Sequence, residues 1–119
     1  MKDYIDRSVW INYFNEFTRR NRSRSTLLEV FGENGAQQQA RGLPFAGISL
    51  GKGNGAPEIE IMLGEHDTRA QRLTHVITKV EQITPKHSQD GRDEVLQIVS
   101  AGETCLLTLD PRPAIGASR

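Results

Sequence analysis

A stripe of aromatic residues near the N-terminus is the feature that most constrains how this chain can fold. Its members recur at positions i, i+3, i+4 and i+7, and they are Trp10, Tyr13, Phe14 and Phe17. At 3.6 residues per turn this spacing places them on one side of a helix, which we expect over residues 6–21. Asp6 is suited to capping the first turn of this helix. The stripe holds four of the seven aromatic residues in the chain, so the rest of the chain must supply a surface that covers it.

After residue 24 the apolar positions alternate with polar ones, which is typical of β-strands with one buried face. The clearest case is the segment 58–63, and a strand over 37–50 is expected to bend near Gly42 and Pro44. The pattern predicts an α+β fold with an N-terminal amphipathic helix and a small, strongly bent, mostly antiparallel β-sheet or SH3/Sm-like barrel of five to six strands. We expect one domain over residues 1–110 and a loose C-terminal tail over 111–119.

The charge balance and the hydropathy restrict the environment of the protein. Fifteen basic and fifteen acidic side chains give a formal net charge of zero, so no global field draws the chain to nucleic acid or to an anionic membrane. Neither the apolar core of a signal peptide nor a membrane-spanning apolar run is present in the sequence. The single Cys105 excludes an intramolecular disulfide. These features predict a cytoplasmic protein that does not bind membranes.

Three stretches of apolar and turn residues resemble a known bacterial family. The first stretch combines Trp10, Phe14 and Phe17 with the pair Arg19-Arg20, the second spans residues 41–48, and the third combines Ile59, Ile61 and Gly64 with residues 73–75 and Ile83. Together they cover about residues 6–110 of the chain. The pattern is similar to that of the bacterial domain-of-unknown-function family fifty-three thirty-five, which is uncharacterised. The resemblance implies a stand-alone domain and no mechanism.

Two glycine motifs match patterns that are found in enzymes. Residues 47–51 match G-x-S-x-G, and Asp67 and His75 follow Ser49 in the order of a hydrolase triad. That motif requires a strand-to-helix turn, whereas a glycine-rich hairpin is expected here. Residues 51–56 match G-x-G-x-x-A, but a strand follows them in place of the helix that would hold a pyrophosphate. We interpret both motifs as strand and turn residues.

The remaining candidates for catalysis or metal binding also have simpler structural explanations. The three histidines, His66, His75 and His87, lack the spacing that places two ligands on one face of an element. Glu58 and Glu60 share a strand face and are expected to face solvent, since paired carboxylates serve acid–base chemistry only within a cleft. We expect Cys105 to be a buried, unreactive thiol. The sequence therefore predicts a protein that is not an enzyme and uses neither a cofactor nor a metal.

Basic residues at the end of the predicted helix are the strongest candidates for a binding site. They are Arg19, Arg20, Arg22 and Arg24, to which Lys52 is added as a more distant basic residue. Arginines placed there complement the helix dipole, and they can also bind phosphates. The favoured hypothesis is a non-enzymatic interaction module that binds another protein or itself. The alternative is binding of RNA or single-stranded nucleic acid through the arginines and Lys52. A hydrolase that uses Ser49 is a third and more distant hypothesis.

A homodimer is predicted from the apolar segment 104–109. This segment is expected to form a strand at an edge of the sheet, and it lacks the Lys or Pro residues that protect such edges. A two-fold contact between copies of the chain would cover an edge of this kind. The alternative is that Leu106 and Leu107 face opposite sides of the strand and are both covered within one chain.

Overall fold

A computed structural model describes residues 3–51, 55–65 and 72–113 of the 119-residue chain. The predicted helix is present as a short 3-10 turn, Arg7–Val9, which leads into α1, Trp10–Asn21. The Asp6 carboxylate accepts a hydrogen bond from the Ser8 N–H, as the capping prediction requires. Trp10, Phe14 and Phe17 are each no more than 2 % exposed, and Tyr13 is partly buried against the same core, which confirms that the aromatic stripe faces the core.

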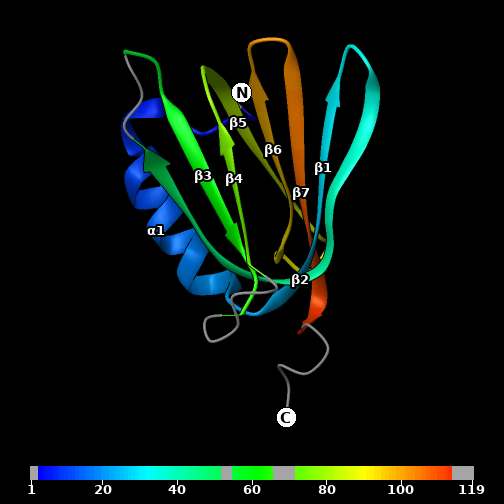
Figure 1. Cartoon of the computed structure of the whole chain (residues 1–119). Helices are drawn as coiled ribbons and strands as arrows, with labels where there is room; N and C mark the ends of the chain where they lie inside the picture. Colours follow the sequence, from blue (N-terminus) through cyan, green and yellow to red (C-terminus); the bar gives the residue numbers. More distant parts are fainter. Residues whose placement is uncertain (1–2, 52–54, 66–71, 114–119) are drawn as a thin grey trace.

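Seven strands follow the helix and form one antiparallel sheet (Figure 1). They are β1 (Arg24–Gly32), β2 (Gly35–Gly51), β3 (Glu58–Leu63), β4 (Leu73–Ile77), β5 (Val80–His87), β6 (Asp93–Ser100) and β7 (Glu103–Pro113). Their order across the sheet is β4-β3-β2-β1-β7-β6-β5, so β4 and β5 form its two ends. The α+β class is confirmed. The prediction of a barrel with five to six strands is wrong, because seven strands form a sheet that stays open between β4 and β5.

The long strand β2 connects the two halves of the sheet. Its first half, up to Pro44, pairs with β1, and its second half, from Phe45 to Gly51, pairs with β3. The change of partner occurs near Gly42, whose φ of 84° lies in the region that glycine favours, and this confirms the predicted bend. Figure 1 shows β2 sweeping from β1 toward β3 and α1. The bend allows the apolar faces of both halves to contribute to one core.

Helix α1 covers the edge of β2 that becomes free where β1 diverges from it. The Thr18 hydroxyl accepts a hydrogen bond from the Ile48 N–H at 3.1 Å and donates to the Ile48 carbonyl at 3.3 Å. The Ser23 N–H donates to the Phe45 carbonyl at 2.9 Å on the same strand. The helix and the residue Ser23 that follows it therefore satisfy backbone groups that would otherwise lack partners, while the aromatic rings of the helix enter the core.

The core lies between the inner faces of the two sheet halves and the aromatic stripe. The alternation predicted for β3 is confirmed, since Ile59, Ile61 and Leu63 are each at most 2 % exposed. Phe17 meets Phe45 of β2 edge to face, with ring centroids 5.5 Å apart. This contact fixes the helix against the bend of β2.

Strand β7 corrects one prediction of the sequence analysis. The segment 104–109 does not lie at an edge, because β7 pairs with β1 on one side and with β6 on the other. Its leucines at 107 and 109 are buried within the chain. The strand runs to Pro113, and residues 114–119 lie outside the described part of the chain. The dimer hypothesis therefore requires a different edge.

Candidate functional site

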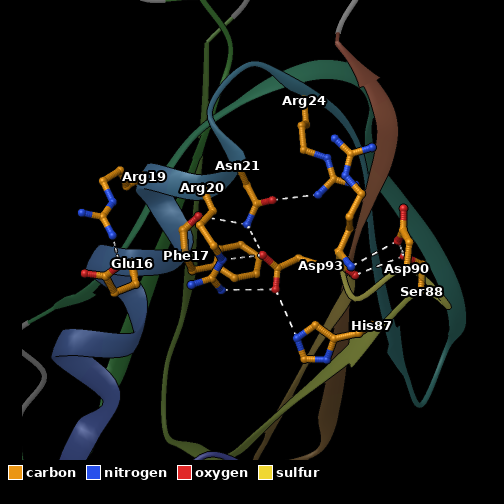
Figure 2. A network of polar contacts seen from close by, with 11 residues as sticks. Glu16, Phe17, Arg19, Arg20, Asn21, Arg24, His87, Ser88, Asp90 and Asp93 are labelled. Atoms are coloured by element: carbon orange, nitrogen blue, oxygen red, sulfur yellow. Dashed lines mark hydrogen bonds and ion pairs between the residues drawn. The ribbon is translucent and has the colours of Figure 1, made fainter.

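The end of α1 is held by a buried carboxylate, Asp93, at the start of β6. This side chain is 7 % exposed and accepts hydrogen bonds from Arg20 Nε at 2.9 Å and from Arg20 Nη2 at 3.2 Å. Asn21 Nδ2 donates to the same carboxylate at 2.8 Å and to the Phe17 carbonyl at 2.9 Å. His87 Nε2 lies 3.5 Å from Asp93 Oδ1. Figure 2 shows these side chains converging on Asp93.

The electrostatics of this network favour the ion pair. Burial alone would raise the pKa of Asp93, but hydrogen bonds from Arg20 and Asn21 and the charge of Arg20 lower it overall. The hydrogen bond to Asp93 is the main reason why the pKa of Arg20 is raised. Burial is the main reason why the pKa of the neighbouring Tyr13 is raised to about 12, so this phenol stays protonated. Arg20 thus contributes to the packing of α1 on the sheet.

Arg24 also serves the fold. Its guanidinium donates to Asn21 Oδ1 at 2.7 Å, to the Asp110 carbonyl at 2.9 Å and to the Leu109 carbonyl at 3.3 Å. Burial lowers the pKa of Arg24, although the group remains charged at neutral pH. The side chain therefore joins the end of the helix to β7.

The other predicted binding residues lie apart from this network. Arg19 forms an exposed ion pair with Glu16, and Figure 2 shows it directed away from Asp93. Arg22 is exposed and lines a cavity of about 790 Å³, whose apolar wall includes Phe45, Met62 and Leu73. Lys52 lies outside the described residues. The structure thus brings Arg20 and Arg24 together around Asn21, and it does not place all four arginines on one exposed surface.

The enzyme-like motifs fall on strands. Ser49 lies within β2 opposite Glu60, and Gly51 continues the strand opposite Glu58. His75 lies on β4 opposite Ile61, and burial lowers its pKa. Asp67 and Gly53, which would complete the two glycine motifs, lie outside the described residues. In the described part of the chain, no helix begins where either motif needs one.

The candidates for metal binding and thiol chemistry are also separated in the fold. Within residues 3–51, 55–65 and 72–113, no three His, Cys, Asp or Glu side chains are grouped so that they could hold a metal ion. His75 and His87 lie on β4 and β5, and His66 is outside the described residues. Cys105 is 3 % exposed, as predicted, and burial raises its pKa to about 12. A thiol with this pKa is almost fully protonated and therefore unreactive.

An open strand edge on β2 is the feature that the sequence analysis missed. Between Gly35 and Pro44 this strand pairs with β1 on one side, and no described strand pairs with its other side. Residues 35–39 are exposed, and three of them form the run Gln37-Gln38-Gln39. Figure 1 shows this half of β2 as the outermost strand of its hairpin with β1. The run of three polar residues breaks the alternation expected of a core strand. This break is the feature of the sequence that could have indicated an exposed edge.

The two terminal strands of the sheet differ in how their outer sides are covered. On β5 the Ile5 N–H donates to the Ile83 carbonyl at 2.8 Å, and the strand contains Glu81, Pro85 and Lys86, which are residues that discourage pairing. Strand β4, Leu73–Ile77, has no charged residue or proline, but it is only five residues long. The β2 edge is therefore the longest uncovered edge within the described part of the chain.

Comparison with known proteins places the chain in a family. No described helix is long and apolar enough to cross a membrane. No curated protein and no solved structure matches the sequence. A family model described as a family of unknown function, DUF5335, matches residues 1–117. This is the family that the residue pattern resembled, and a match over nearly the whole length shows that the chain belongs to it.

Proposed function

We propose that this protein is a non-enzymatic interaction module that binds a protein partner by strand addition at the open edge of β2. The single observation that supports this proposal is the uncovered edge of residues 35–41, which lies before Phe45, where pairing with β3 begins. Such an edge presents a row of backbone N–H and C=O groups that can pair with a further strand.

The contrast between the edges of the sheet strengthens the proposal. The β5 edge has the protection that natural sheets use against unwanted pairing, including Pro85, Lys86 and the contact from Ile5. The second half of β2 is covered by Thr18 and Ser23. In the first half of β2 the charged Arg41, Pro44 and the irregularities of the strand all lie beyond Gln38, and the exposed segment 35–38 has neither a charged residue nor a proline. Glutamine side chains add hydrogen-bonding groups to a strand interface and do not repel an incoming strand.

The site chemistry is consistent with a binding role. Cys105 is buried and protonated, and Ser49 lies within a strand. Arg20 and Arg24 are engaged with Asp93 and with backbone carbonyls, which reduces the positive charge available for phosphate groups. Nucleic-acid binding through the arginines is accordingly the weaker proposal, and it would depend on the exposed Arg19 and Arg22. A reducing, cytoplasmic location remains a proposal that the single unpaired cysteine supports.

Affinity capture with matched baits tests the proposed function. The tagged full-length chain is compared with Gln37→Lys, which places a charge on the open edge, and with Gln82→Lys, which makes the same change on an exposed position of β5. We expect partners that are retained by the parent and by Gln82→Lys to be lost from Gln37→Lys. Each such partner is then purified and must bind the purified chain directly, with no other protein present.

Two outcomes would contradict the proposal. The first is retention of the same proteins by all three baits. The second is retention of RNA alone, with binding that weakens steeply with salt and is abolished by Arg22→Glu. That result would favour the nucleic-acid alternative.

A further inference from the structure

We propose that the partner at the open edge is a second copy of the chain, paired antiparallel so that Gln37 of one copy lies opposite Gln37 of the other. This inference rests on the proposed function and specifies both the occupant and the register. An edge that pairs with itself about a two-fold axis presents the same surface on both sides, which is the commonest arrangement in soluble assemblies. The resulting sheet would continue from β1 and β2 of one copy into β2 and β1 of the other.

The charges along the hairpin support this occupant and this register. Glu33 lies in the turn between β1 and β2, and Arg41 lies near the end of the open edge. Both side chains are exposed, and neither makes an ion pair within the described part of the chain. Glu33 precedes the start of β2 at Gly35, and Arg41 follows an irregularity of the strand between Gln38 and Ala40, so both charges lie just outside the regular part of the edge. When Gln37 faces its own copy, the antiparallel order brings the turn that carries Glu33 in each copy beside the end of the edge that carries Arg41 in the other. The dimer therefore gains two symmetric ion pairs.

Neighbouring registers lack this complementarity. A pairing centred on Gln38 would place Arg41 opposite Gly35, so neither copy would have a charge opposite its arginine. The turn that carries Glu33 would then be displaced from Arg41 of the other copy by two residues. Moving the centre from Gln37 to Gln38 slides the second copy by two residues and leaves every side chain on its own face, so the two registers differ in which charges lie side by side.

The outer face of the hairpin also carries an exposed apolar side chain. Phe31 is 38 % exposed and lies opposite Ala36 across the β1–β2 pair. In the proposed register, Gln38 of the second copy lies opposite Ala36. The aliphatic carbons of this Gln38 then lie in one row with Ala36 and Phe31. Pairing of the two copies therefore removes apolar surface from water. The open edge of β4 has no comparable pair of opposite charges.

Sedimentation of the full-length chain with charge-exchange variants tests this inference. At about 100 µM we expect the parent to form a species of twice the 13.3 kDa chain mass. Arg41→Glu and Glu33→Arg each replace both ion pairs with like-charge contacts, so each should weaken dimerisation by about tenfold or more. The double variant Glu33→Arg/Arg41→Glu restores opposite charges and should return the dimer to about the parental affinity. Glu81→Arg, on an exposed position of β5, is the matched control and should leave dimerisation unchanged.

The outcomes separate this inference from the proposed function. A parent chain that remains monomeric, or a double variant as weak as its single variants, overturns the inference. If the Gln37→Lys bait still loses protein partners in that case, the edge binds a different protein and the proposed function stands. If the baits retain identical partners as well, both proposals fail. Circular dichroism on each variant excludes unfolding as the cause of a lost dimer.

Discussion

Replacing Asp93 with asparagine is expected to destabilise the fold while leaving the shape of the side chain unchanged. The carboxylate accepts two hydrogen bonds from Arg20 and one from Asn21, and it is 7 % exposed. The introduced amide can accept only at its oxygen, and its NH2 group would face donors. Hydrogen bonds to charged groups contribute about 1.5–3 kcal/mol each, so the loss of all three would exceed about 4 kcal/mol. This sum is an upper limit, because the amide oxygen can take the place of Oδ2 and still accept from Arg20 Nε and from Asn21.

The exposure of Arg20 reduces the expected loss in the free energy of unfolding. Its side chain is 43 % exposed and can recover hydrogen bonds with water, and Asn21 keeps its bond to the Phe17 carbonyl. We therefore expect Asp93→Asn to lower the free energy of unfolding by about 2–4 kcal/mol at pH 7, measured by urea denaturation. Asp90→Asn is the matched control, because this exposed side chain bonds only within its own turn. A loss below about 1 kcal/mol for Asp93→Asn would refute our account of how α1 is held.

The pH dependence provides a second test of the same network. The pKa of Asp93 in the folded chain lies below its ordinary value of 3.8, so the unfolded chain binds the proton more readily. The stability that this group contributes is therefore fully present well above pH 3.8 and is lost as the pH falls through the folded pKa. Asp93→Asn should lack this part of the acid destabilisation. If the variant and the parent lose stability equally between about pH 5 and about pH 2, Asp93 does not titrate as described.

Three further predictions concern the helix and the core. Thr18→Val leaves the Ile48 N–H and carbonyl without the hydroxyl and should cost about 1–3 kcal/mol in urea denaturation, whereas Thr18→Ser should retain most of the stability. Trp10→Ala removes a ring that is 2 % exposed and should cost about 3–5 kcal/mol by the same measurement; a loss under about 1 kcal/mol would contradict the docking of the helix. Cys105 should react slowly with a thiol reagent in the native chain and rapidly in denaturant, and rapid native labelling would contradict its burial.

Local patterns in the sequence were sufficient to predict several elements of the fold. The aromatic spacing predicted the buried face of α1, and the alternation of residues 58–63 predicted which side chains of β3 are buried. The bend at Gly42 followed from the residue types, because glycine and proline interrupt regular pairing. These features depend on interactions between residues close together in the chain or on one face of one element.

The order of the strands could not be predicted, since it depends on contacts between distant residues. No local pattern indicated that β7 would lie between β1 and β6, and this led to the wrong edge for the dimer. The roles of Arg20 and Arg24 also depended on distant partners. Arg20 binds Asp93, which is 73 residues away in the chain, and Arg24 binds the backbone of Leu109 and Asp110. A cluster of charges in the sequence therefore divided into groups that support the fold and groups that remain exposed.

Backbone amide hydrogen exchange across residues 35–41 is the measurement that tests the role of the open β2 edge most directly. It should be recorded on the full-length chain at about 1 µM and at about 500 µM, where strand pairing between copies is expected to be scarce and extensive respectively. The account predicts that amides on the uncovered side of β2 become protected at the higher concentration, while amides of β5 exchange at the same rate in both samples. Equal exchange of residues 35–41 at the two concentrations would contradict strand pairing between copies at this edge.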